Sequence, residues 1–159
     1  MERALRKHLR GGRFRGVGAA RSKAMGAVRG RANRTTERRL RMAMVRAGMS
    51  GWRLHPPHIP GNPDFFFAET KLVVFVDGCF WHGCRKCGHI PRTNSRFWGA
   101  KITGNRARDR RMDRRLRRLG LRVVRFWEHD LQLNLGECLR AVCSAAISDA
   151  RVDRQWGRP

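Results

Sequence analysis

The sequence predicts an α/β fold in which a small mixed central sheet is flanked by helices. Residues 71–76 form an almost continuous apolar run, which is typical of a strand buried on both faces. Residues 121–127 form a second apolar, strand-like segment. Apolar residues recur at helical spacing in residues 36–47, 104–119 and 136–150. Helices interspersed with short strands favour an α/β arrangement.

The first helix is expected to follow a cap at Thr35 or Thr36, whose hydroxyl groups can accept hydrogen bonds from the first backbone amides. Glu37 lies in its first turn, and Gly48 is expected to end it. Residues 51–63 are rich in proline and glycine and are expected to form a loop.

A hairpin is expected next. Residues 64–67 begin an extended segment, residues 68–70 make a turn, and residues 71–76 return as the buried strand, which Asp77 and Gly78 end.

The second half of the chain is expected to begin with a loop over residues 78–98, rich in cysteine, histidine and aromatic residues. A helix over residues 104–119 then ends at Gly120 and leads into the strand over residues 121–127. The last element is an amphipathic helix over residues 136–150.

The chain is strongly basic: 36 Lys and Arg residues against 12 Asp and Glu residues give a formal net charge of +24. A small globular protein with this charge is expected to bind a polyanion, most often nucleic acid. Most of the excess charge lies in residues 1–47 and 101–125, on either side of a nearly neutral centre. This pattern suits a DNA duplex that is contacted on both sides of a reaction site.

The length of 159 residues suits one domain. We expect a basic, flexible N-terminal arm over residues 1–20, a single domain over residues 21–150 and a tail over residues 151–159. We expect no transmembrane helix, because no run of about 18 apolar residues occurs, and no secretory signal, because no apolar stretch follows the basic N-terminus.

Three of the five cysteines lie close together, at Cys79, Cys84 and Cys87. Short spacings of this kind let thiolates converge on a tetrahedral zinc ion, and an odd number of cysteines argues against a disulfide framework. By spacing alone the fourth ligand could be any of four residues: His82, His89, His129 or Cys138. The alternative is a loop with reduced cysteines that bind no metal. Cys143 is expected to be an ordinary core residue.

Asp64 and Asp77 lie next to the two strands of the expected hairpin, so their carboxylates could meet at one edge of the sheet and hold a divalent cation over a phosphodiester. His82 follows on the loop that zinc would stiffen. Asp109 opens the second long helix and Glu37 the first. Each acid has a structural alternative, as a strand-end turn residue or a partner of a helix dipole. Together, on a cationic chain, they favour a metal-dependent nuclease.

Six segments, in order along the chain, resemble the very short patch repair endonucleases. They are residues 21–25 (RSKAM), 61–65 (GNPDF), 74–84 (VFVDGCFWHGC), 97–98 (FW), 109–111 (DRR) and 127–128 (WE). The resemblance implies a restriction-endonuclease-like fold and Mg²⁺-dependent nicking of one DNA strand 5′ to the thymine of a T:G mismatch, which arises when 5-methylcytosine deaminates.

The same resemblance implies the partners and the location. The substrate is double-stranded DNA with a T:G mismatch, mismatch-repair proteins are candidate partners, and the enzyme acts as a monomer in the bacterial cytoplasm at the nucleoid.

The resemblance also assigns residue roles. Asp64 resembles the family's metal-binding aspartate and His82 its general acid/base, supported by Asp109. Glu37 resembles the acidic residue of the first helix, and Asp77 the sheet-edge carboxylate of this nuclease fold, which would also hold Mg²⁺. The structural zinc set implied is Cys79, Cys84, Cys87 and His129.

Phe80 and Trp81 lie between an expected zinc ligand and His82, on a short loop where exposed aromatic rings would need a partner. We expect them to enter the base stack at the weak mismatched pair, with Trp98 beside them and Met25 from the opposite groove. The alternative is that Phe80 and Trp81 pack under the zinc loop. Two other functions remain open: a related nuclease with another lesion or sequence specificity, and a zinc-containing DNA-binding module without cleavage.

Overall fold

The computed structural model describes residues 37–147. The expected arm over residues 1–20, the expected tail over residues 151–159, the expected caps Thr35 and Thr36, and Met25 lie outside the described residues.

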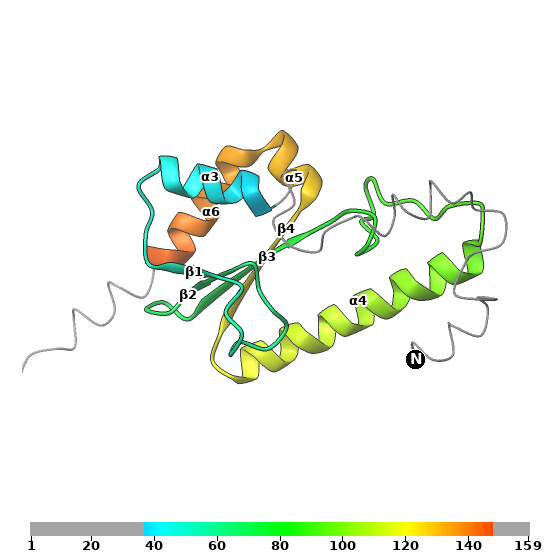
Figure 1. Cartoon of the computed structure of the whole chain (residues 1–159), viewed down its shortest axis with the longest axis horizontal. Coiled ribbons are helices and arrows are strands. Elements are labelled where there is room, and N and C mark those ends of the chain that lie inside the picture. Colours follow the sequence, from blue (N-terminus) through cyan, green and yellow to red (C-terminus); the bar gives the residue numbers. More distant parts are fainter. Residues whose placement is uncertain (1–36, 148–159) are drawn as a thin grey trace, which may run out of the picture.

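The described chain is a mixed α/β unit with one four-stranded sheet (Figure 1). The strand order is β1-β2-β3-β4; β1, β2 and β3 pair antiparallel, and β4 runs parallel to β3. The predicted hairpin is β2 and β3, and the predicted mixed sheet is confirmed. In chain order the elements are α3 (Glu37–Arg46), β1 (Trp52–Leu54), β2 (Phe65–Phe67), β3 (Leu72–Asp77), α4 (Ser95–Arg118), β4 (Arg122–Trp127), α5 (Glu128–Leu133) and α6 (Leu135–Ile147).

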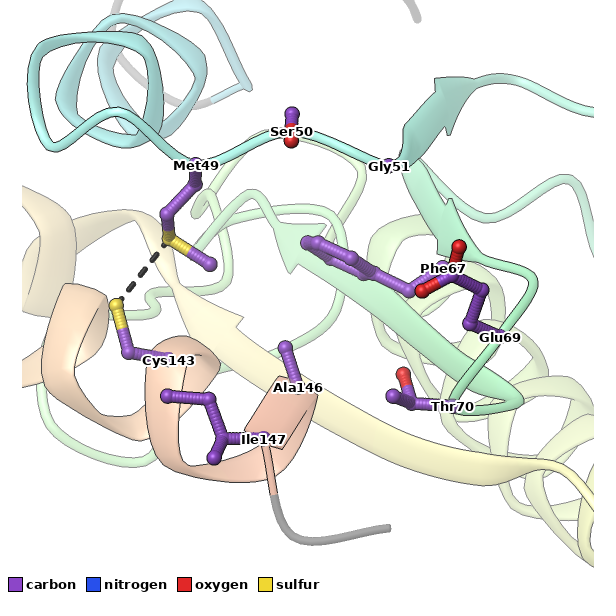
Figure 2. A pocket seen from close by; sticks show the side chains of 9 residues that line it. All are labelled: Met49, Ser50, Gly51, Phe67, Glu69, Thr70, Cys143, Ala146 and Ile147. Carbon is purple, nitrogen blue, oxygen red and sulfur yellow. Dashed lines mark hydrogen bonds between the residues drawn. The ribbon is translucent and has the colours of Figure 1, made fainter. Parts of the chain in front are cut away.

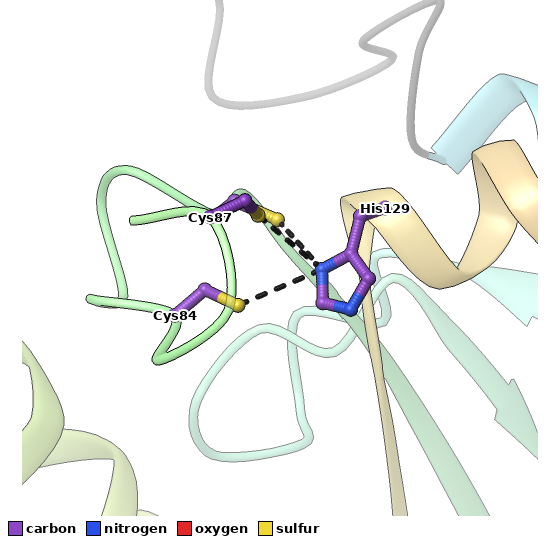
Figure 3. Close-up of side chains that lie close together, drawn as sticks. Cys84, Cys87 and His129 are labelled. Carbon is purple, nitrogen blue, oxygen red and sulfur yellow. Dashed lines mark hydrogen bonds between the residues drawn. The ribbon is translucent and has the colours of Figure 1, made fainter. Parts of the chain in front are cut away.

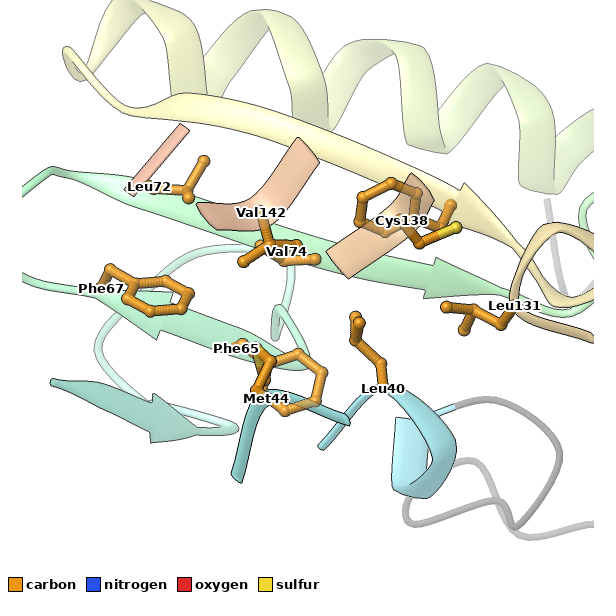
Figure 4. Packing of buried hydrophobic residues seen from close by; sticks show 10 residues of the cluster. Leu40, Met44, Phe65, Phe67, Leu72, Val74, Leu131, Cys138 and Val142 are labelled. Atoms are coloured by element: carbon orange, nitrogen blue, oxygen red, sulfur yellow. The ribbon is translucent and has the colours of Figure 1, made fainter. Parts of the chain in front are cut away.

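Helices cover both faces of the sheet. On one face α3, α5 and α6 pack over side chains that include Phe65, Leu72 and Val74 (Figure 4). On the other face Leu116 of α4 packs with Val73 and its neighbours. Because successive residues of a strand point to opposite faces, both faces of β3 are buried, as its continuous apolar run predicts. Each such buried side chain stabilises the fold by about 1.5–3 kcal/mol.

Three elements differ from the prediction. The short strand β1 lies within the predicted loop over residues 51–63, because three residues between glycine and proline are too few to show a strand periodicity. The six-residue helix α5 is not predicted either, because so few residues show no clear helical periodicity. Helix α4 begins at Ser95 rather than at residue 104, although Gly99 and Gly104 lie in this first part and glycine disfavours helix. The prediction that Asp109 opens this helix is therefore wrong: Asp109 lies in its middle, away from the first turn where a helix dipole acts.

The helix ends agree better with the sequence. Gly48 and Gly120 follow α3 and α4 with φ of 69° and 74°, a left-handed conformation that glycine adopts without steric cost. Helix α6 covers the predicted residues as far as Ile147, where the described part ends. Among the described helices, none combines the length and the apolar character that crossing a bilayer would require.

Candidate functional site

Asp64 lies directly before β2, where it faces the end of β3. Its backbone N–H donates to the Val74 carbonyl at 3.0 Å, and its Oδ2 accepts a hydrogen bond from the Val76 N–H at 2.7 Å. Burial raises the pKa of Asp64 to about 6, although the Val76 hydrogen bond lowers it. The neighbouring carboxylate of Glu37 also raises it. A carboxylate in this environment gains from a nearby cation.

Asp64 lies in a group with Glu37 and His55, in which one ligand atom of each residue lies within 4.8 Å of the others. The Glu37 side chain is buried at the start of α3, and its Oε1 lies 3.0 Å from His55 Nε2. The sequence prediction included Glu37 and Asp64 but missed His55. His55 could be found only from the register of β1 and β2, which places it opposite Asp64. This register is known only once the two strands are paired.

His82 and Asp109 form the second group of the site. Nδ1 of His82 lies 2.7 Å from Asp109 Oδ2 and 3.6 Å from Asp77 Oδ1. Burial by itself lowers the pKa of His82. The hydrogen bond with Asp109 and the charge of Asp77 raise it by more than burial lowers it, so the net shift is upward. Burial raises the pKa of Asp109, but the hydrogen bond with His82 and the charge of His82 lower it, and the net shift is downward. The structure therefore brings together three acid/base residues named from the sequence.

Asp77 has a further partner, Arg125 of β4, which the sequence prediction missed. Arg125 Nη1 donates to both carboxylate oxygens of Asp77 at 2.8 Å, and its Nε donates to Asp113 Oδ1 at 2.9 Å. The guanidinium also lies 4.2 Å from the ring centroid of Phe75. Asp77 thus has an arginine as its ion-pair partner, although its charge still acts on Asp64, whose pKa it raises.

Asp64, Asp77, His82 and Asp109 line one cavity of about 530 Å³. Arg108 and Arg125 lie at the same cavity, so cationic and anionic groups face a common space. Carboxylates that can hold a cation, beside an imidazole that can exchange a proton, are the groups that phosphodiester hydrolysis requires.

A separate group consists of Cys79, Cys84, Cys87 and His129, whose ligand atoms lie within 4.8 Å of one another. The three Sγ atoms lie 3.2, 3.6 and 3.5 Å from His129 Nδ1 (Figure 3). Tetrahedral zinc with its usual bond lengths would separate sulfur and nitrogen ligands by about 3.6 Å, so the four residues fit such an ion.

The other three candidates for the fourth ligand lie elsewhere. His82 pairs with Asp109, the His89 ring lies 5.7 Å from that of Phe80, and Cys138 is part of the core beside α3. Gly88 allows the cysteine loop to close, since its N–H donates to the Cys84 carbonyl at 2.9 Å and a Cβ atom at this position would overlap that carbonyl.

Phe80, Trp81 and Trp98 form an aromatic cluster between the cysteine loop and the start of α4. The ring centroids of Phe80 lie 5.1 Å from Trp81 and 5.3 Å from Trp98, and those of the two tryptophans are 5.9 Å apart. All three side chains are partly exposed, so none is wholly in the core. The Trp81 carbonyl accepts a hydrogen bond from Asn105 of α4, which ties the loop to that helix.

Another cavity, of about 220 Å³, lies between the end of α6 and the segment that follows α3 (Figure 2). Apolar side chains and the Cys143 thiol, which donates to Met49 Sδ at 3.2 Å, make up much of its wall. Its described lining contains neither a histidine nor an arginine, so it offers no counterpart to the acid/base pair of the larger cavity.

Residues 17–88 match the sequence model of the family described as DNA mismatch endonuclease Vsr. The chain is 40% identical over 112 residues to the DNA mismatch endonuclease Vsr of Escherichia coli (strain K12), which covers 69% of this chain and 70% of the relative. It is 45% identical over 82 residues to the type II nicking enzyme V.XorIIP of Xanthomonas oryzae pv. oryzae, covering 50% of this chain, and 45% identical over 69 residues to V.NaeI of Lentzea aerocolonigenes, covering 43%. These two matches span 60% and 42% of the relatives' own lengths, less than two thirds of each.

Proposed function

The chain belongs to the Vsr family of DNA mismatch endonucleases, and from this premise we propose that it nicks one strand of duplex DNA 5′ to the thymine of a T:G mismatch, with Mg²⁺ as the catalytic ion. The nick would start very short patch repair of deaminated 5-methylcytosine. The cavity that Asp64, Asp77, His82 and Asp109 share is the observation that carries this proposal, since it joins a cation-binding carboxylate to an acid/base pair.

Asp64 is the proposed Mg²⁺ ligand, with Glu37 beside it. Mg²⁺ supplies, when bound, a Lewis acid for the scissile phosphate and a bound water that ionises more easily. The Val76 N–H holds Oδ2 of Asp64 in place, which orients the carboxylate for this role.

His82 is the proposed general acid/base. Asp109 lies at Nδ1, so Nε2 is the atom that can exchange a proton with water or with the leaving oxygen. We propose Asp77 as a second acid of the site. Because Arg125 occupies both oxygens of Asp77, its role as a Mg²⁺ ligand requires that Arg125 yield one of them, whereas its proximity to His82 already stabilises the imidazolium.

The Cys79, Cys84, Cys87 and His129 group is proposed to hold one structural zinc ion. Such an ion would join the loop that carries His82 to the end of β4, and so would fix the position of the general acid/base. The mixed sheet with helices on both faces agrees with a restriction-endonuclease-like fold, which we propose for this domain.

The aromatic cluster is proposed to read the mismatch. Phe80, Trp81 and Trp98 are partly exposed beside the catalytic loop, and apolar rings inserted between base pairs cost a few kcal/mol of unstacking, less where pairing is already weak. Met25 would enter from the opposite groove, as the family resemblance implies.

A nicking assay tests the proposal. Purified protein is incubated with Mg²⁺ and end-labelled duplexes that are matched or that contain T:G or another mismatch, in several sequence contexts. We expect one product, cut 5′ to the mismatched thymine, and we expect Asp64→Asn to abolish it while DNA binding persists, because the carboxylate that holds the cation is lost. Glu69→Gln, an exposed acid outside the cavity, is the matched control.

Other outcomes identify the alternatives. Cleavage of another mismatch or of a matched sequence would indicate a related nuclease with a different specificity. Tight DNA binding without any nick would indicate a binding module. Full nicking by Asp64→Asn would remove Asp64 from the mechanism.

A further inference from the structure

His55 lies where β1 and β2 end side by side. Leu54 pairs with Phe65 as the last residues of the two strands, and the His55 N–H donates to the Asp64 carbonyl at 3.3 Å. His55 and Asp64 are therefore the next facing pair along the same ladder, and the side chains of facing residues in antiparallel strands start about 5 Å apart. The register of this hairpin thus brings an imidazole to the proposed metal-binding carboxylate.

Glu37 completes the group from a third element, the first turn of α3. Its Oε1 lies 3.0 Å from His55 Nε2, and one donor atom from each of the three residues lies within 4.8 Å of the other two. Adjacent ligands of an octahedral cation with bonds of about 2.1–2.2 Å lie about 3.0 Å apart, and opposite ligands about 4.3 Å. The 3.0 Å between Glu37 Oε1 and His55 Nε2 matches adjacent ligands, and the other two donor pairs lie no more than 4.8 Å apart, close to the largest ligand spacing of such an ion.

The charges of the group also call for a cation. Glu37 is only 4% exposed, and a second carboxylate, Asp64, lies close to it. The two carboxylates repel one another, and this repulsion is one cause of the raised pKa of Asp64. A divalent cation held by both carboxylates would remove the repulsion.

We propose that His55 is a third protein ligand of the catalytic cation, beside Glu37 and Asp64, and that the site consequently binds a transition-metal dication such as Mn²⁺ more tightly than Mg²⁺. This inference rests on the proposed function, which places the catalytic cation at Asp64. Imidazole is a good ligand for first-row transition metals, whereas Mg²⁺ prefers carboxylate, carbonyl and water oxygens. The competing explanation is that His55 only forms a hydrogen bond with Glu37 and contacts no metal.

Electron spin-echo spectroscopy of Mn²⁺ separates the two explanations, because it detects a nitrogen atom bound directly to the ion. The sample is the full chain, loaded with zinc so that the Cys/His group does not take up Mn²⁺, without DNA. We expect a ¹⁴N imidazole signal in the wild type that changes to a ¹⁵N signal when histidine is ¹⁵N-labelled. In His55→Asn, a residue that tolerates the left-handed backbone at this position, the signal disappears.

His58→Gln is the matched control, since His58 is exposed three residues away and packs edge-on against Phe66. It keeps the nitrogen signal and the Mn²⁺ affinity. His55→Asn lowers the Mn²⁺ affinity by about tenfold or more and the Mg²⁺ affinity by less. Mn²⁺ bound to the wild type without a nitrogen signal, or an unchanged signal in His55→Asn, would overturn the proposal.

These results are distinguishable from a failure of the proposed function. If the wild type nicks T:G duplex with Mg²⁺ and Asp64→Asn does not, but Mn²⁺ shows no bound nitrogen, only the role of His55 is wrong. If Asp64→Asn binds Mn²⁺ as the wild type does, the catalytic cation does not lie at Asp64, and both proposals fail.

Discussion

Asp64 must be ionised to hold a cation, yet its burial favours the protonated form. The pKa of its carboxyl group is raised to about 6, so the group is ionised above neutral pH and becomes protonated as the pH falls through that value. A proton and a cation compete for the same oxygens, and this competition makes metal affinity depend on pH.

We therefore expect the Mg²⁺ or Mn²⁺ affinity to be almost constant above about pH 7 and to fall by about tenfold per pH unit below about pH 6. Calorimetric or paramagnetic titration of zinc-loaded protein at a series of pH values measures this dependence. In Asp64→Asn the part of this dependence that the Asp64 carboxyl group causes should be absent. A constant affinity down to about pH 4 would show that the Asp64 carboxyl group retains an ordinary pKa.

Trp81 is the single residue on which mismatch discrimination is expected to depend most. Stacking of a base on an aromatic side chain is worth about 1–3 kcal/mol, so Trp81→Ala should lose roughly 5- to 150-fold in the preference for T:G over T:A duplex. Single-turnover nicking rates on the two duplexes measure the preference. Trp81→Phe, which keeps a ring, should retain part of it. An unchanged preference in folded, zinc-containing Trp81→Ala would exclude a role for this ring in recognition.

The cysteine loop acts as an element that joins two distant parts of the chain. Cys79, Cys84 and Cys87 follow β3, whereas His129 follows β4, and these strands are parallel neighbours. Because Asp77 pairs with Trp127, the residues after the two strands emerge at the same edge of the sheet. A metal ion at this edge would hold the loop, and with it His82, against the sheet.

Replacement of one ligand tests this joining role. We expect Cys84→Ser to lose most bound zinc and to lower Tm by about 5 °C or more, since a loss of a few kcal/mol shifts Tm by about 2–4 °C per kcal/mol in a domain of this size. Elemental analysis and thermal unfolding measure the two effects. Cys143→Ser is the control, because Cys143 lies on α6 outside the metal-binding group. Zinc-free wild type, or an unchanged Tm in Cys84→Ser, would count against a structural ion.

The elements show which local signals are reliable. The apolar run of β3 and the glycines after α3 and α4 predict their elements well, because each signal lies within the element itself. β1 is stabilised by pairing with β2, and α5 by the packing of Leu131 in the core with residues such as Leu40, so their own few residues carry little information. The first part of α4 forms despite two glycines, against its local propensity.

For the molecule as a whole, the net charge of +24 should dominate the salt dependence of DNA binding. Residues 1–20 include six Lys and Arg residues. Their deletion is expected to weaken binding equally for all sequences, and to reduce the slope of log K against log salt by up to about 5, without moving the cut. Fluorescence-anisotropy titrations at several salt concentrations, with matched and T:G duplexes, measure both quantities. A changed mismatch preference after deletion would mean that these residues contact bases.

The amino-acid sequence is enough to predict a polyanionic partner, the α/β class, the β2–β3 hairpin and the cysteine-rich loop, because these depend on composition or on residues that are neighbours in the chain. Which residues face one another across elements becomes apparent only once the chain is folded. The parallel pairing of β3 and β4 selects His129 among the four candidates to complete the cysteine group, and it brings Arg125 to Asp77. The register of β1 and β2 brings His55 to Asp64. Such contacts follow from strand pairing and helix packing between segments that are many residues apart, and a local sequence pattern does not reveal them.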